Sequence, residues 1–299
     1  MSAAEHTTVL RGEWRENEPL ARYTSWQIGG PADRLYVPAD VDDLAAALAG
    51  LPVSEPVFWL GLGSNLLIRD GGIRGTVIST RQALGGLEAL GRGRVYAGAG
   101  VACAKAARFC TRNDLVGAEF LAGIPGTIGG ALAMNAGAWG GETWPHVEVV
   151  QTVDRHGVQR ERPTEDYRIG YRTVEGPADE WFTGVRFVFE EGDGGAARER
   201  IRRLLEERGL RQPTGTKNCG SVFRNPPGDH AARLIEAAGL KGTSIGGAAV
   251  SEKHANFILN RGDARAADIE TLIERIQAQV ERRFGIRLQR EVEIVGEPA

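Results

Sequence analysis

The sequence predicts an α+β protein whose first part is rich in strands and glycine and whose smaller second part mixes helices with strands. Short apolar runs that end at glycines recur up to about residue 190, which is typical of buried strands that lead into loops. Beyond that point apolar residues recur every three or four positions, which is typical of helices. A chain of 299 residues is long enough for two or three structural units.

Local patterns place the elements of the first part. Strands are expected where apolar runs are short or alternate with polar residues, and a hairpin is expected around the turn at His156 and Gly157. The expected strands are 57–60, 75–78, 95–97 and 185–189, the expected helix is 102–111, and the expected hairpin joins 147–153 to 158–160.

The second part begins after an acidic, glycine-rich linker at 191–195. Helices are expected at 197–208, at 231–238 with Asp229 as its cap, and at 269–284, where Gly285 ends the helical pattern. A final strand is expected at 288–295. The change in pattern predicts a domain boundary near residue 195.

Composition excludes several classes of protein. The net charge of -3 and a pI near 6.0 argue against a nucleic-acid partner, and no long basic run marks a membrane surface. The three cysteines, at 103, 110 and 219, form no CxxC pair, so we expect neither a disulfide framework nor a zinc site, and a reducing compartment fits. The charged first 17 residues lack the apolar core of a signal peptide.

The segment from Phe120 to Gly141 contains no charged residue and is long enough to cross a bilayer in principle. It holds Pro125, Asn135 and seven glycines, and its flanking charges are both acidic. A glycine-rich loop system that lines a ligand explains this segment better than a membrane helix does.

Two glycine-rich loops are the main candidates for ligand binding. Residues 61–66 follow an expected strand, but the third glycine of a dinucleotide fingerprint is missing and no helix start follows, which disfavours a Rossmann site. Residues 123–130 form the second loop and lack the ending of a triphosphate-binding loop. Backbone N–H groups in such turns can bind a pyrophosphate, so the pair suggests one extended ligand between two lobes. Two unrelated tight turns are the alternative.

Other motifs are weaker when each is taken alone. Residues 242–246 match the nucleophile elbow of hydrolases, but a helix precedes them and His254 comes before Asp263, the wrong order for that fold. Residues 219–226 form a turn with a thiol, a hydroxyl and polar residues. Arg172 and Glu291 are, by themselves, ordinary surface or ion-paired residues.

Taken together, several segments resemble the family of UDP-N-acetylenolpyruvoylglucosamine reductases from about Thr24 to Gly296. The resemblance rests on six motifs in the family's order. These are residues 24–31, 61–70, 119–138, 220–226, 234–242 and 251–257.

The resemblance implies a two-lobed FAD-binding module of the vanillyl-alcohol-oxidase (PCMH) type, followed by a substrate domain. The implied divisions are 20–85 and 86–194 for the two FAD-binding lobes and 195–299 for the substrate domain. It also implies non-covalently bound FAD, NADPH as reductant, a UDP-sugar substrate, a role in peptidoglycan precursor synthesis and a cytoplasmic setting, with no metal, membrane insertion or protein partner.

Site residues are carried over from the family by motif. The implied catalytic residues are Arg172 to hold the substrate carboxylate, Ser221 to donate a proton, and Glu291 to stabilise charge as a neutral acid or hydrogen-bond partner. Tyr171 and Asn225 are the implied substrate contacts. The implied cofactor contacts are Gly61, Gly63, Ser64, Asn65, Leu66, Gly123, Ile124, Pro125, Gly126, Gly129, Gly130, Asn135, Ala136 and Gly137.

The sequence departs from the family at Thr173 and Val174, where serine often follows the arginine, and at Cys219, where alanine is common. No extra tyrosine-bearing loop lies between Arg172 and Ser221, which indicates the shorter class of the family. The rivals are another flavin oxidoreductase, disfavoured in its histidine-linked form because no histidine lies near residues 61–72, and a non-catalytic sensor, disfavoured because all three catalytic positions are filled.

Overall fold

A computed structural model describes residues 9–81 and 83–299, which form two compact units. The first unit comprises the chain up to Arg15 together with Leu35–Gly61 and Val77–Gly194. The second comprises Glu16–Arg34, Leu62–Thr76 and Gly195–Ala299. The α+β class is confirmed. The division into residues 20–85, 86–194 and 195–299 stays a prediction, and the signal-peptide expectation concerns a segment whose first eight residues lie outside the described chain.

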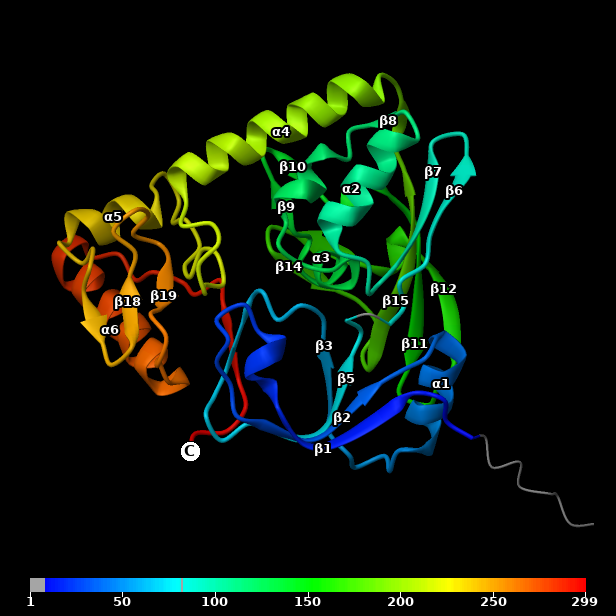
Figure 1. The fold of residues 1–299 in the computed structure, drawn as a ribbon, viewed down its shortest axis with the longest axis horizontal. Helices are drawn as coiled ribbons and strands as arrows, with labels where there is room; N and C mark the ends of the chain where they lie inside the picture. Colours follow the sequence, from blue (N-terminus) through cyan, green and yellow to red (C-terminus); the bar gives the residue numbers. More distant parts are fainter. Residues whose placement is uncertain (1–8, 82) are drawn as a thin grey trace, which may run out of the picture. The chain divides into compact units, whose positions relative to one another are not determined.

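The first unit contains a five-stranded antiparallel sheet in the order β12–β11–β15–β7–β6. These strands are drawn in green and cyan in Figure 1. The predicted hairpin and the predicted strands at 95–97 and 185–189 belong to this sheet, although its third strand ends one residue before Phe189. Their bounds are Gln159–Pro163, Val147–Asp154, Glu180–Val188, Arg94–Gly98 and Leu87–Gly91, in sheet order.

A second sheet has the order β1–β2–β5–β3. It includes the predicted strands at 57–60 and 75–78, and the division between the units crosses its first three members. The bounds are Glu13–Pro19, Pro31–Val37, Ile73–Ser79 and Val57–Leu60.

Three helices belong to the first unit. Asp40 caps α1 (Val41–Gly50) by accepting the N–H of Asp43, and Thr127 caps α3 (Ile128–Met134) by accepting that of Gly130. The predicted helix at 102–111 is α2 (Cys103–Arg112), whose two cysteines are buried and free. One apolar core joins α1 to the sheets through Tyr36, Leu44, Leu48, Ile78 and Val153.

The second unit is organised around α6 (Ala266–Phe284), the long helix predicted from the apolar periodicity. Its buried face includes Ile269, Leu272 and Ile276, and Gly285 ends it at a φ of 67°. A three-stranded sheet, β17–β18–β19, and the helix α5 contribute to the same core (Figure 1). Their bounds are Ser244–Ile245, Ala248–Val250, Ile258–Asn260 and Ala231–Ala237.

Three details differ from the sequence-based expectations. The predicted linker is partly structured, because Glu190–Glu191 forms β16 and α4 (Gly194–Arg211) begins within the linker and ends three residues later than expected. Asp229 was wrong as the cap of α5, since its carboxylate pairs with Arg233 and accepts the N–H of His230. The last strand is shorter than predicted, because only Glu293–Val295 forms β20, which runs parallel to β4 (Leu66–Ile68).

The remaining elements are short. They are the strands β8 (Leu115–Val116), β9 (Gly137–Ala138), β10 (Gly141–Glu142), β13 (Arg168–Gly170) and β14 (Thr173–Glu175), and the 3-10 turns η1 (Leu20–Tyr23), η2 (Glu119–Gly123), η3 (Trp144–His146) and η4 (Thr164–Asp166). Within the described ranges, none of the helices combines the length and apolarity that crossing a membrane requires.

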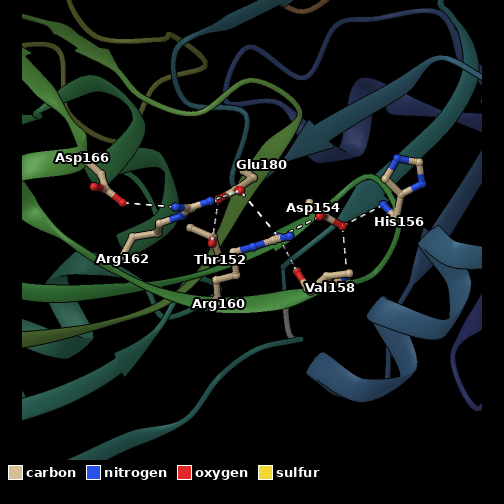
Figure 2. Close-up of polar contacts among 8 residues, drawn as sticks. All are labelled: Thr152, Asp154, His156, Val158, Arg160, Arg162, Asp166 and Glu180. Carbon is tan, nitrogen blue, oxygen red and sulfur yellow. Dashed lines mark hydrogen bonds and ion pairs between the residues drawn. The ribbon is translucent and has the colours of Figure 1, made fainter.

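A polar network fastens β11, β12 and β15 together (Figure 2). Glu180, 7% exposed, accepts hydrogen bonds from Arg162 at 2.5 and 3.1 Å and from the Thr152 hydroxyl at 3.0 Å. Arg160 lies 2.7 Å from the Asp154 carboxylate, whose other oxygen accepts the N–H groups of the hairpin turn. The bonds from Arg162 hold the pKa of the Glu180 carboxyl below its ordinary value of 4.5, although burial opposes them.

Replacing Glu180 with glutamine should therefore destabilise the protein by about 1.5–3 kcal/mol at neutral pH, because it removes a buried charged acceptor. A carboxyl whose folded pKa is depressed stabilises the protein above its unfolded pKa, and it loses that contribution as the pH falls through the folded pKa. Denaturant unfolding of both proteins should thus show a gap at pH 7 that narrows below pH ~4.5. A gap that is constant with pH would contradict the charged role of Glu180.

Candidate functional site

In the second unit, one extended segment, residues 289–295, pairs with two others. On one side the N–H groups of Glu291 and Val292 donate to the Val222 carbonyl at 2.8 and 3.3 Å, and Arg224 N–H donates to the Gln289 carbonyl at 2.9 Å. On the other side β20 pairs with β4, and Glu293 N–H donates to the Asn65 carbonyl at 3.0 Å. This pairing places the predicted residues Ser221, Glu291 and Asn65 on neighbouring segments.

Ser221 is half-buried and follows Gly220, which has a φ of +82°. Among the residues that the structure describes, no partner hydrogen-bonds to the Ser221 hydroxyl. The backbone after it is fixed by the pairing with Glu291 and Val292. A fixed main chain that carries an uncommitted hydroxyl suits a group that acts on a ligand.

Asn65 bridges the first glycine loop and the segment that carries Glu291. Its side-chain amide donates to the Glu291 carbonyl at 3.0 Å. Gly63 has a φ of +57°, and a Cβ there would overlap the Tyr23 carbonyl oxygen, so only glycine fits. Within the described chain, the N–H groups of Leu62, Gly63 and Ser64 have no protein acceptor. Three successive N–H groups without an acceptor suit an anion such as a pyrophosphate.

Cys219 lies two positions before Ser221, and the charge of Glu291 affects its thiol. Burial raises the pKa of its thiol well above the ordinary value, and the charge of Glu291 raises it further. The thiol is free and 5% exposed. It therefore stays protonated, which makes it a poor nucleophile.

Asn225 is exposed, and its side-chain oxygen accepts the N–H of Ala231, the first residue of α5, at 3.1 Å. This bond, and not one from Asp229, serves the start of α5. It spans six positions in sequence. Contact between Asn225 and a substrate remains a prediction.

In the first unit, Arg172 occupies the turn of the hairpin formed by β13 and β14. Gly170 pairs with Thr173, so Tyr171 and Arg172 form a two-residue turn. Arg172 has a φ of 54°, a left-handed conformation that is strained for a residue other than glycine. Its guanidinium lies 3.4 Å from the Gly137 carbonyl and 5.8 Å from the ring of Tyr171, which is 58% exposed. Strain at a non-glycine residue is frequent at functional sites.

Asn135 joins this hairpin to the second glycine loop. It is buried at the C-cap of α3 with a φ of 43°. Its amide nitrogen donates to Glu142 at 3.0 Å and to the Gly170 carbonyl at 3.3 Å, and its oxygen accepts the N–H of Trp144 at 3.1 Å. Asn135 was predicted to contact the cofactor, but its side-chain amide is hydrogen-bonded within the protein. It holds Gly170, the residue before Tyr171.

The second glycine loop approaches the end of β3 within the first unit. A Cβ on Gly61 would lie 2.7 Å from the Thr127 hydroxyl, and one on Gly129 would lie 3.0 Å from Ala99. The N–H groups of Ile128 and Gly129 donate hydrogen bonds to the carbonyls of Val101 and Ala99. In the part of the chain with coordinates, the N–H groups of Gly126 and Thr127 have no protein acceptor. This loop therefore offers a ligand fewer N–H groups than a free helix start would.

The other predicted cofactor contacts follow these two loops. Leu66 opens β4, and Gly137 opens β9. Gly123 ends η2 beside the ring of Trp139, which a Cβ on Gly123 would meet at 2.9 Å. Ile124 and Ala136 are buried, while Pro125 and Gly130 are exposed.

Each unit thus assembles a part of the predicted site. The second unit brings Ser221, Glu291 and Asn65 onto adjacent segments, and the first brings Arg172, Asn135 and Gly137 together. The catalytic and binding roles of these residues stay predictions.

Two residues that support the first loop had no predicted role. Asp70 accepts the N–H groups of Ala266 and Ala267 at the start of α6, and Arg69 pairs with Glu270 at 2.7 and 3.0 Å. The partners lie about 200 positions apart, so no local pattern reveals them.

Known proteins resemble the chain along nearly its whole length. Residues 32–161 match the model of an FAD binding domain, and residues 212–295 match that of the C-terminal domain of UDP-N-acetylenolpyruvoylglucosamine reductase. Proteins named UDP-N-acetylenolpyruvoylglucosamine reductase from Alkalilimnicola ehrlichii and Methylococcus capsulatus are each 60% identical to it, over 99% of this chain and 99% and 97% of theirs.

A solved structure agrees with these relatives. The crystal structure of UDP-N-acetylenolpyruvylglucosamine reductase from Thermus caldophilus matches with a TM-score of 0.82 at 33% identity. The match covers 96% of this chain and 100% of that one. The chain therefore belongs to the UDP-N-acetylenolpyruvoylglucosamine reductase family.

Proposed function

We infer that the protein uses FAD and NADPH to reduce UDP-N-acetylglucosamine enolpyruvate to UDP-N-acetylmuramate, a step of peptidoglycan precursor synthesis. Family membership supports the activity and the cofactors. The observation that supports the assignment of residues is the pairing of segment 289–295 with residues 222–224 and 65–68, because it brings the Ser221 turn, Glu291 and the end of the first glycine loop onto neighbouring segments.

The residues present fit FAD. The N–H groups of Leu62, Gly63 and Ser64, which have no acceptor in the described protein, would hold its pyrophosphate. When bound, FAD would supply the hydride-transfer chemistry that links NADPH to the substrate. No histidine lies in residues 61–72, which agrees with non-covalent binding.

Arg172 would bind the carboxylate of the enolpyruvyl group. A vinyl ether is electron-rich, so its double bond accepts a hydride only when the adjacent carboxylate is polarised. A guanidinium matches the geometry of a carboxylate with two parallel hydrogen bonds, and it stabilises the negative charge that develops there. The guanidinium contacts the Gly137 carbonyl at 3.4 Å, which limits the directions open to this side chain.

The hydride would go to the terminal carbon of the enolpyruvyl double bond. Ser221 would then deliver a proton to the other carbon of that bond. Its hydroxyl is uncommitted, and the pairing of Val222 with Glu291 holds its main chain still. A serine is a weak acid, but the charged intermediate is a strong base, and a positioned proton donor typically contributes about 10²–10⁴-fold. Glu291 would stabilise the developing charge only in its protonated form, by donating a hydrogen bond from the neutral carboxyl group.

The finer features are proposals of the same kind. Tyr171 and Asn225 would contact the sugar nucleotide. The enzyme would act in the cytoplasm, without a protein partner.

Replacing Gly63 with alanine should lower FAD occupancy, because the new Cβ would overlap the Tyr23 carbonyl and force the loop open. Flavin absorbance per purified chain measures this. Gly91→Ala is the matched control, since Gly91 also has a positive φ, of 80°, but a Cβ there meets nothing within 4 Å. Full occupancy in a folded Gly63→Ala protein would argue against this loop as the pyrophosphate site.

Replacing Arg172 with glycine should abolish turnover without lowering stability. Glycine relieves a left-handed conformation that costs other residues about 1–2 kcal/mol. Thermal unfolding and steady-state turnover test the two halves of this expectation. Arg172→Lys keeps the charge but loses the forked geometry, so it should remain strongly impaired. Normal turnover by either variant would refute the carboxylate clamp.

Replacing Ser221 with alanine should leave reduction of the flavin by NADPH intact. It should slow reoxidation by the enolpyruvyl substrate about 10²–10⁴-fold, because only the second half-reaction needs the proton. Anaerobic rapid mixing separates the two steps. Ser54→Ala, at an exposed loop position, is the control. Wild-type reoxidation in Ser221→Ala would remove Ser221 from the mechanism.

A further inference from the structure

Asn256 holds the turn that carries Ser221. It lies in the motif at residues 251–257, and no role was predicted for it. It lies between β18 and β19 and is 4% exposed. Its side-chain oxygen accepts the N–H of Phe223 at 3.0 Å, and its side-chain nitrogen donates to the Phe223 carbonyl at 2.8 Å. Its main-chain carbonyl accepts the N–H of Val222 at 2.9 Å. The amide thus pairs with Phe223 as a neighbouring strand would.

The backbone of residues 222–224 is hydrogen-bonded on two sides, and Asn256 supplies the bonds on one of them. Segment 289–292 holds the other edge through Val222 and Arg224. On its N-terminal side the turn is preceded by Gly220, whose surroundings are open, since a Cβ there would meet nothing within 4 Å. In the described protein the Ser221 hydroxyl has no acceptor or donor of its own. The position of that hydroxyl therefore follows from the backbone that Asn256 fixes.

We propose that Asn256 is a positioning residue for proton delivery by Ser221. This inference rests on the proposed function, which makes Ser221 the proton donor. Phe223 is 1% exposed, so loss of the amide would leave its N–H and carbonyl buried without partners, and the turn would shift to satisfy them. Proton transfer is sensitive to such shifts, because a displacement of about 1 Å at a reacting group can cost about 10²-fold in rate.

A general loss of stability is the alternative explanation for any defect, and Asn260 provides the control for it. It is 8% exposed, and its amide also bonds the main chain at both ends, donating to Trp26 at 2.9 Å and accepting from Gly262 at 2.8 Å. None of these bonds reaches residues 221–224. Asn260→Ala should therefore reproduce the loss of stability without the defect in proton delivery.

The experiment uses the full-length holoenzyme and follows the flavin by rapid mixing, first with NADPH and then with UDP-N-acetylglucosamine enolpyruvate. Asn256→Ala should be reduced at the wild-type rate but reoxidised about 10²-fold more slowly. Asn256→Asp keeps the acceptor for Phe223 N–H and loses the donor, so its reoxidation should be intermediate. This variant also serves if Asn256→Ala does not fold.

The double variant Ser221→Ala/Asn256→Ala tests whether Asn256 acts through the serine. It should reoxidise no more slowly than Ser221→Ala alone, because residues that act through one group are not additive. Multiplied defects in the double variant would overturn the inference. The inference would also be overturned if Asn256→Ala and Asn256→Asp were reoxidised as fast as Asn260→Ala while Ser221→Ala remained slow. Both of these results would leave the proposed function unchanged. Normal reoxidation in Ser221→Ala would instead overturn the proposed function, and the positioning role with it.

Discussion

The backbone pairing of residues 289–295 is the constraint on which the candidate chemistry depends. This segment hydrogen-bonds to the Ser221 turn on one side and to the first glycine loop on the other. Main-chain pairing fixes neighbouring segments about 4.8 Å apart, so it holds the Ser221 turn, Glu291 and the first glycine loop in a set order. The chain closes this array only at its C-terminal end, so the site depends on residues far apart in sequence.

Beyond the ends of the strands, asparagine side chains hydrogen-bond to the main chain. Asn65 donates to the Glu291 carbonyl, Asn256 completes the edge of the Ser221 turn, and Asn135 ties the Arg172 hairpin to the end of α3. An amide can both donate and accept, so it imitates the main chain at irregular positions. The same chemistry recurs in both units, which indicates that the loops are held rigid by bonds within the protein.

The elements that depend on local sequence patterns could be predicted. The strand at 57–60, the hairpin at 147–160 and helix α6 follow from apolar periodicity, and the glycine loops follow from composition. Non-local contacts were beyond reach. Asn65 meets Glu291 across 226 positions. The start of α5 is bonded by Asn225, six positions before it, while Asp229 pairs with Arg233. The resemblance named Arg172, Ser221 and Glu291, but it gave neither the strained turn at Arg172 nor the free hydroxyl of Ser221.

The protonated thiol of Cys219 has a chemical consequence of its own. Reduced flavins react with oxygen to give peroxide, and a thiolate two residues from Ser221 would be an easy target for oxidation. Burial and the neighbouring carboxylate suppress the thiolate form. The protein can thus carry a sulfur atom two positions before Ser221 with little risk of oxidation, and reagents that alkylate thiolates would find little to attack there.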